Sequence, residues 1–188
     1  FEIELYYAAT DRLTLSGNFS YTETEYGEDY FVFTVDDPIN PVPVFGTFTQ
    51  GFVSAQVTDP SQASDYTVNL KGGPLKGIPE EKATIRVSYE QDTRFGPLYY
   101  LLSHSYTGDF SASGIQRPLD RIDSRETTNL NISWYSQDGN LSLRAYVDNL
   151  FDNDNYYALS TGDHETNYRK SVTALPPRVM GLDIRYRF

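Results

Sequence analysis

The stretch NLNISWYSQDGNLSLRAYVDNL, residues 129–150, decides the fold class of this chain. Apolar and polar side chains alternate along it with a period of two, the pattern of a β-strand with one apolar face. Asp138-Gly139 interrupts the alternation and is typical of a tight hairpin turn. The stretch therefore predicts two antiparallel strands that share an apolar face. Its members are Leu130, Ile132, Trp134, Leu141, Leu143, Ala145 and Val147.

The same period recurs outward from this hairpin, and no segment shows convincing helical spacing. In the strand at 97–107, apolar residues occur at both odd and even positions, so the sequence does not assign its two faces. The alternation is already under way at Phe1, which predicts that the first strand is truncated. Seven strands are expected in all. They lie at about 1–9, 13–25, 82–91, 97–107, 126–137, 140–150 and 179–188.

The connections between these strands alternate between short and long. The short ones are 10–12, 92–96 and 138–139, whereas 26–81, 108–125 and 151–178 are long. Transmembrane barrels show this asymmetry, with tight turns on one side of the membrane and long loops on the other. We therefore expect an all-β chain that forms part of an antiparallel transmembrane β-barrel. Seven strands do not close such a barrel, so the chain is expected to be the C-terminal part of a larger one.

The composition of the chain excludes or disfavours several classes of function. The chain has 188 residues, no cysteine, 16 tyrosines, 11 phenylalanines and a net charge of −11. The missing cysteines exclude a disulfide scaffold and thiolate chemistry, and the acidic balance disfavours nucleic acid as a partner. His104 and His164 are isolated, and Asp152 and Asp154 match a strand-exit turn better than a calcium loop. We expect no enzyme activity, no metal site and no cofactor.

Four motifs carry a family resemblance. They are LSLRAYVDNLFDNDNYY at 141–157, Pro177-Arg178 before the last strand, GGPLKGIPEEKATIRVSYE at 72–90 and SYTGDF at 105–110. In this order they resemble the C-terminal part of TonB-dependent outer-membrane receptors. The resemblance implies a 22-stranded barrel filled by an N-terminal plug domain. Residues 1–188 would then be the C-terminal portion of the barrel, with the plug and the earlier strands absent from this sequence.

The resemblance also implies a function. Such a receptor of the bacterial outer membrane binds a scarce nutrient at the cell surface, a ferric siderophore as first choice, and imports it with energy coupled through TonB. The expected partners are outer-membrane lipid, the TonB-ExbB-ExbD complex through the missing N-terminal part, the barrel-assembly machinery and a small nutrient ligand. Rival interpretations are a passive porin-like channel, an outer-membrane enzyme or adhesin barrel, and a soluble all-β binding domain.

The alternation assigns two faces. We expect the lipid face to contain Leu130, Ile132, Trp134, Leu141, Leu143, Val147, Leu182 and Ile184. The lumen face is expected to contain Arg86, Arg144, Asp148, Asp183, Arg185 and Arg187, together with Glu2, Glu4 and Glu90. These charges form either a salt-bridge ladder along a wet wall or contacts with a plug or a passing substrate.

Aromatic residues are concentrated in the long connections. The candidate ligand-binding residues are Tyr30, Phe31, Phe33, Phe45, Phe48, Phe52, Tyr156, Tyr157 and Tyr168. They either pack the loops against their neighbours or form the outer wall of a ligand site, because loops beyond about 12–15 residues are usually functional or disordered. Phe188, a terminal aromatic that closes an alternating strand, is expected to act as an assembly signal.

Overall fold

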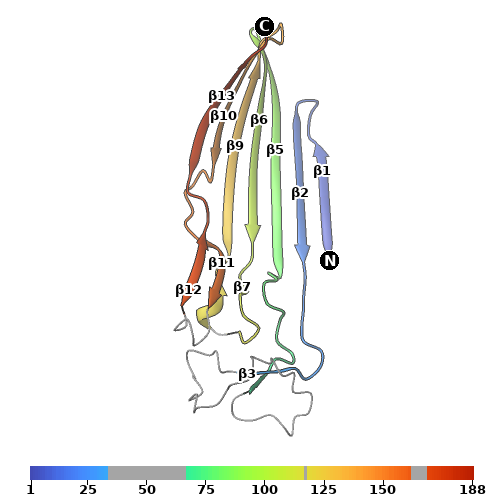
Figure 1. The fold of residues 1–188 in the computed structure, drawn as a ribbon. Helices are drawn as coiled ribbons and strands as arrows, with labels where there is room; N and C mark the ends of the chain where they lie inside the picture. The colour runs from blue at the N-terminus through green and yellow to red at the C-terminus, as the bar shows by residue number, and fades with distance from the viewer. Residues whose placement is uncertain (34–66, 117, 162–168) are drawn as a thin grey trace.

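The computed structural model describes residues 1–33, 67–116, 118–161 and 169–188. Within these ranges the chain is built almost entirely from antiparallel strands (Figure 1). None of the described helical segments is long and apolar enough to cross a membrane.

One sheet of seven strands dominates the fold, which confirms the predicted fold class. Its strands follow the chain order, β1-β2-β5-β6-β9-β10-β13, so each strand pairs with the next one in the meander. The strand predicted at 13–25 ends earlier, at Tyr21. The bounds are Glu2–Ala8 for β1, Leu13–Tyr21 for β2, Glu81–Thr93 for β5, Gly96–Thr107 for β6, Arg125–Tyr135 for β9, Leu141–Asp148 for β10 and Val179–Tyr186 for β13.

The short turns gather at one end of the sheet, beside the C-terminus, and the described residues of the long connections lie at the other end (Figure 1). The turn from β5 to β6 is closed by Gly96, whose φ of 124° and close approach to the Tyr135 carbonyl exclude a side chain. At the β9–β10 turn, Ser136 donates a hydrogen bond to Asp138. That bond, with further ones from Asn140, lowers the pKa of Asp138 below its ordinary value. Local side-chain chemistry therefore closes these turns.

The register places most apolar residues of the seven strands on one face, here called the apolar face. One row across the sheet shows this: Leu15 pairs with Val87, Val87 with Leu102, Leu102 with Leu130, Leu130 with Val147 and Val147 with Met180. Because side chains alternate between faces, this pairing also settles the strand that the sequence left open. On β6, the even-numbered residues from Leu98 to Tyr106 belong to the apolar face.

The height of the apolar face suits a bilayer. From Leu98 to Tyr106, β6 covers roughly 27 Å at about 3.4 Å per residue. A strand tilt of about 40° reduces this to roughly 21 Å, close to the apolar band of about 25 Å on membrane barrels. Glu81 and Glu126 mark the edge of the band toward the long connections.

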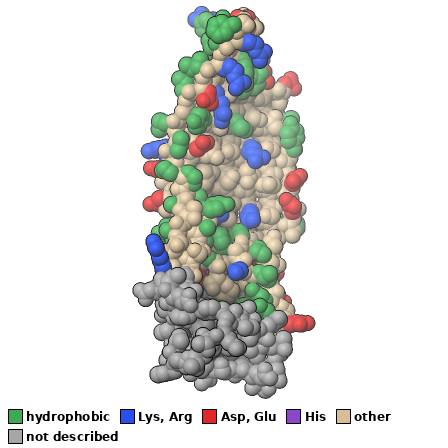
Figure 2. Space-filling model, viewed as in Figure 1, with side chains coloured by type: hydrophobic (Ala, Val, Ile, Leu, Met, Phe, Trp, Pro, Cys, Tyr) green, Lys and Arg blue, Asp and Glu red, His purple; other side chains and the backbone are tan. Residues whose placement is uncertain are grey.

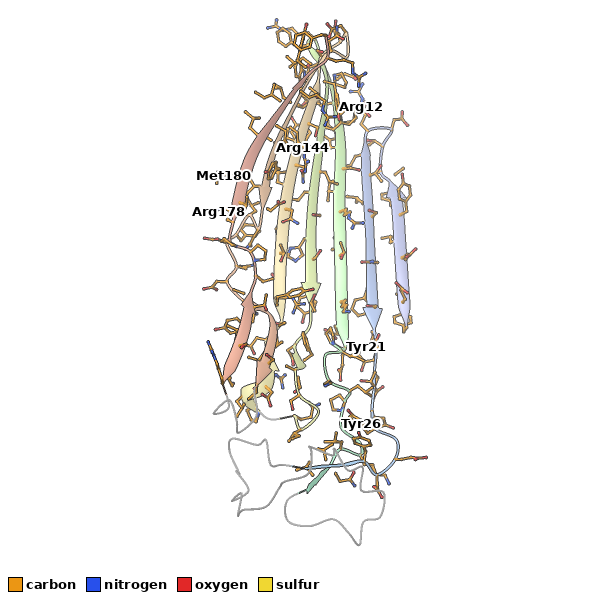
Figure 3. All side chains as sticks on the ribbon, in the orientation of Figure 1. Arg12, Tyr21, Tyr26, Arg144, Arg178 and Met180 are labelled. Carbon is orange, nitrogen blue, oxygen red and sulfur yellow. The ribbon has the colours of Figure 1, made fainter. Side chains whose placement is uncertain are left out.

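The opposite face, here called the polar face, is held by hydrogen bonds and charges. Arg144 donates two hydrogen bonds to the Asn131 side-chain oxygen, at 3.0 and 2.8 Å, and lies 3.8 Å from an Asp183 carboxylate oxygen. Figure 3 shows Arg144 over the central strands and Met180 pointing away from the β13 margin. Figure 2 shows Lys and Arg side chains spread along the length of the sheet.

Candidate ligand-binding site

Among the described residues, three pairs of short antiparallel strands lie at the long-connection end, where the sequence predicted only loops (Figure 1). Each gives the backbone of a long connection its own pairing, which reduces its unpaired polar groups. They are β3 (Phe31–Phe33) with β4 (Thr67–Asn69), β7 (Phe110–Ser111) with β8 (Arg121–Ile122), and β11 (Tyr156–Thr161) with β12 (Lys170–Ala174).

The base of the first long connection is an ordered cluster. Tyr26 and Tyr30 stack with ring centroids 5.8 Å apart, and Tyr26 also exchanges backbone hydrogen bonds with Gly72 and Gly73. Asp29 accepts a 3.0 Å hydrogen bond from Asn69 and lies 3.2 Å from the Lys71 ammonium. These two contacts, that with Asn69 first, lower the pKa of Asp29. Figure 3 shows Tyr26 well below Tyr21, the last residue of β2.

The described candidate aromatics fall into two groups. Tyr30 directly precedes β3, which contains Phe31 and Phe33, whereas Tyr156 and Tyr157 begin β11. Tyr156 and Tyr157 are 47% and 60% exposed and so are available to a ligand. Among the side chains that the structure describes, no ring contact joins Tyr30 to Tyr156 or Tyr157. Phe45, Phe48, Phe52 and Tyr168 lie outside the described residues.

Arg125, the first residue of β9, was not among the residues that the sequence indicated. Its guanidinium carbon lies 5.7 Å from the centre of the Phe110 ring and 5.5 Å from that of Tyr157. Phe110 comes from the connection between β6 and β9, and Tyr157 from the one between β10 and β13. Arg125 therefore joins two long connections at the polar face, a contact that sequence spacing alone does not reveal.

Asn149 fixes the base of the last long connection. It is 4% exposed, and its side chain donates hydrogen bonds to the carbonyls of Asn153 and Pro176 while accepting one from the Asn153 backbone. Its own backbone N–H bonds to the Asn129 side chain at 2.9 Å. Asn149 has a φ of 51°, a conformation that Asn tolerates better than most residues. The chain leaving β10 is thereby tied to β9 and to the segment that precedes β13.

Asp152 continues this arrangement and has the role of a turn residue. Its carboxylate accepts a 2.8 Å hydrogen bond from the Arg178 backbone, directly before β13. Figure 3 shows Arg178 at the point where this last strand begins. Among the described residues, no group of three or more His, Cys, Asp or Glu side chains could hold a metal ion. The contacts of Asp152 agree with the strand-exit turn that the sequence indicated.

The expected lumen charges share one face of the sheet. The register puts Arg86, Asp148 and Arg185 on the same side as Arg144 and Asp183. Arg187 follows β13, and its backbone bonds to the Asn140 carbonyl at 2.8 Å. That this face lines a lumen remains a prediction from the sequence.

A cavity of about 560 Å³ lies at the long-connection end. It is lined by Leu75, Glu81, Tyr106, Asp109, Gln116 and Arg121, among others. The lining includes Glu81 and Tyr106, which belong to the apolar face, and also Phe110, the ring that lies against Arg125. Arg121, the basic residue in this lining, already forms an ion pair with Asp109.

Comparison with solved structures gives the architecture. The ferric yersiniabactin uptake receptor FyuA of Yersinia pestis superposes with a TM-score of 0.68 and 16% identity, over 100% of this chain and 23% of that receptor. The siderophore receptor PiuA of Acinetobacter baumannii superposes with a TM-score of 0.65 and 13% identity, over 98% of this chain and 21% of that receptor. The chain has the fold of part of a TonB-dependent outer-membrane receptor barrel.

The likeness to these receptors is one of structure. A mutant of the ferric enterobactin receptor PfeA of Pseudomonas aeruginosa matches with a TM-score of 0.57 and 16% identity, over 100% of this chain and 22% of that one. The chain thus spans about a fifth of the length of the receptors that it resembles. No protein-family model matches the sequence, and no curated protein matches it.

Proposed function

We propose that this chain forms part of the barrel wall of an outer-membrane receptor that binds a scarce nutrient at the cell surface and imports it with energy coupled through TonB. A ferric siderophore is the first candidate for the nutrient. The observation that carries the proposal is the continuous apolar face of a seven-stranded meander, whose strands lead into the long connections at one end, on the fold of siderophore receptors.

Exposure of the apolar face supports the membrane location. Met180, Leu182 and Ile184 of β13 are 68%, 63% and 65% exposed, and Leu5 at the other margin is 64% exposed. Apolar patches of this extent are rare on soluble proteins and mark membrane or protein contacts. On a membrane barrel, lipid covers such a face, and the outer membrane of a Gram-negative bacterium is the location that the fold favours.

The long-connection end is the side on which a ligand would be captured. Short turns of membrane barrels lie in the periplasm and long loops outside the cell. The exposed Tyr156 and Tyr157 and the half-buried Tyr30 then belong to the extracellular mouth. Aromatic rings combine large contact area with low entropy loss, which suits them to ligand capture.

Transport in cells tests the proposal. The gene for the full-length protein would be deleted, and uptake of radioactive iron supplied as ferric siderophores would be measured with and without TonB. We expect uptake to fall in the deletion strain and to require TonB when the gene is restored. Uptake that continues at the restored rate without TonB would indicate a passive channel, and iron uptake unchanged by the deletion would overturn the assignment of ferric siderophores.

A further inference from the structure

His104 is a polar residue inside the apolar band. It pairs with Thr128 across β6 and β9, and both residues belong to the apolar face. The next row toward the long connections pairs Tyr106 with Glu126, which marks the edge of the band. His104 therefore lies one row inside this edge, about 5 Å along the membrane normal for strands tilted by about 40°. At this depth, each hydrogen-bonding group of the ring needs a partner.

The contact between His104 and Thr128 assigns the proton of the imidazole ring. Thr128 is only 5% exposed, and its hydroxyl lies 2.9 Å from His104 Nδ1, its one side-chain or backbone partner among the described residues. A buried hydroxyl that leaves its hydrogen unused is unfavourable, so we assign Thr128 as the donor to Nδ1. In the neutral imidazole the proton then lies on Nε2, which becomes a donor.

The Nε2–H group of His104 has no acceptor within the described part of the chain. It is nevertheless accessible, because His104 is half-buried and the one enclosed side-chain nitrogen or oxygen without a partner, among described residues that are not exposed, belongs to Arg125. The neighbouring Ile85 and Leu102 are 57% and 39% exposed and offer no acceptor. An acceptor must therefore come from whatever covers the apolar face.

A membrane lipid supplies an acceptor close to this depth. Hydrocarbon tails have no polar atoms, and water is scarce among them. The ester or amide carbonyls at which acyl chains begin lie at the boundary between the hydrocarbon layer and the headgroups. Histidine combines an apolar body with a polar tip, so its tip can turn toward this boundary. A carbonyl oxygen only accepts hydrogen bonds, which matches the donor left on Nε2.

We propose that His104 and Thr128 form a lipid-binding site on the outside of the barrel wall, in which His104 Nε2–H donates a hydrogen bond to an acyl-chain carbonyl oxygen. Thr128 keeps the proton on Nε2 by donating to Nδ1. Because long connections of membrane barrels lie outside the cell, the lipid belongs to the outer leaflet. The inference goes beyond nutrient uptake and depends only on the membrane location of the apolar face.

A comparison of two lipids tests this inference. The full-length protein is folded into vesicles of phosphatidylcholine with ester-linked chains, or of its ether-linked analogue, which has the same chains but lacks the carbonyls. Urea titration then gives the unfolding equilibrium constant in each lipid. The variants are His104→Phe and His104→Gln. Tyr100→Phe is the matched control, because the Tyr100 hydroxyl lies on the same face but already donates to Gln91.

The ether lipid should raise the unfolding constant of the wild type about fivefold more than that of His104→Phe, as expected for one net hydrogen bond. Comparing the two lipids within each variant removes the cost of the substitution itself, including the lost acceptor of the Thr128 hydroxyl. His104→Gln should keep part of the lipid dependence, since its amide still has N–H donors. Tyr100→Phe should respond to the two lipids as the wild type does.

Solid-state NMR provides a second measurement that does not depend on the stability of a variant. With nitrogen-15 in the histidine rings and carbon-13 in the lipid carbonyls, we expect a dipolar contact between a ring nitrogen and a carbonyl in the wild type. The contact should disappear in folded His104→Phe.

Four results would overturn the inference. They are an equal response of the wild type and His104→Phe to the two lipids, a loss of lipid dependence in Tyr100→Phe as large as in His104→Phe, the absence of a contact between histidine and lipid in the wild type, and a contact that persists in folded His104→Phe. All four would leave the proposed uptake function standing, because none of these measurements concerns transport.

Discussion

The two faces of the sheet are made by the same seven strands, yet they are held by different forces. On the apolar face, two pairs of described polar side chains contact each other inside the band: His104 lies 2.9 Å from the Thr128 hydroxyl, and Tyr100 donates to Gln91 at 3.1 Å. On the polar face, Arg144 is exposed and contacts the Asn131 side chain, the Asp183 carboxylate and the Tyr146 ring. A polar group facing lipid must find a protein partner, whereas one facing water need not.

The largest expected effect comes from the same substitution on neighbouring residues. Val87 and Ser88 are adjacent on β5 but belong to opposite faces, and Val87 lies in the middle row of the apolar face. Val87→Arg should reduce the unfolding free energy of the full-length barrel by roughly 2–4 kcal/mol, as for arginine at a bilayer midplane. Ser88→Arg should change it by less than about 1 kcal/mol. Urea titration in lipid vesicles measures both, and equal losses would contradict the assignment of faces.

The next largest loss of stability is expected from disturbed packing on the polar face. The Tyr146 ring lies over Gly181, and a Cβ atom on Gly181 would come within 2.4 Å of the ring. Gly181→Val should destabilise the barrel by roughly 1–3 kcal/mol, because the ring must leave its place. The double variant with Tyr146→Ala should lose less than the sum of the single variants. Strict additivity in the same titration would show that the two residues do not interact.

The C-terminal residue tests how the last strand is assembled. Phe188 is fully exposed, and its ring meets that of Tyr186 at 5.0 Å. Deleting Phe188 from the full-length protein should lower the folded amount in the outer membrane several-fold, if this ring is the assembly signal. Heat-modifiable mobility on a gel measures the folded fraction. An unchanged amount would remove this role from Phe188.

The smallest effect is expected from an exposed ion pair. Arg144 and Asp183 have side chains that are 54% and 63% exposed. Such pairs are worth about 0–1 kcal/mol, so Arg144→Gln should lower the unfolding free energy by less than about 1 kcal/mol. A loss comparable with that of Val87→Arg would mean that this residue is enclosed in the intact protein. Urea titration of the two variants side by side decides between these outcomes.

The sequence predicted the faces and turns of the sheet because both depend on local patterns. Period-two alternation assigned β9, β10 and β13, and Asp138-Gly139 marked a turn that the structure contains. The faces of β6 required the register, since Leu98, Leu101 and Leu102 break the alternation and only pairing with β5 and β9 orients them.

The candidate site was less accessible from sequence. Exposed aromatics such as Tyr156 and Tyr157 could be found by composition. Arg125 could not, because its two ring partners come from connections distant in the chain. Asn149 was visible only as part of a motif, and its role follows from contacts with Asn129 and Pro176 that spacing does not encode.

A nitroxide scan of β10 tests the central claim most directly. The chain has no cysteine, so single cysteines at positions 141–148 of the full-length protein, made free of cysteine elsewhere, can each carry a spin label. In lipid, labels at the apolar positions, such as Leu143 and Val147, should collide preferentially with oxygen. Labels at the polar positions, such as Ser142 and Arg144, should collide with a water-soluble nickel complex. This alternation with a period of two is the result predicted for a barrel wall, and equal access of the nickel complex to both sets would contradict it.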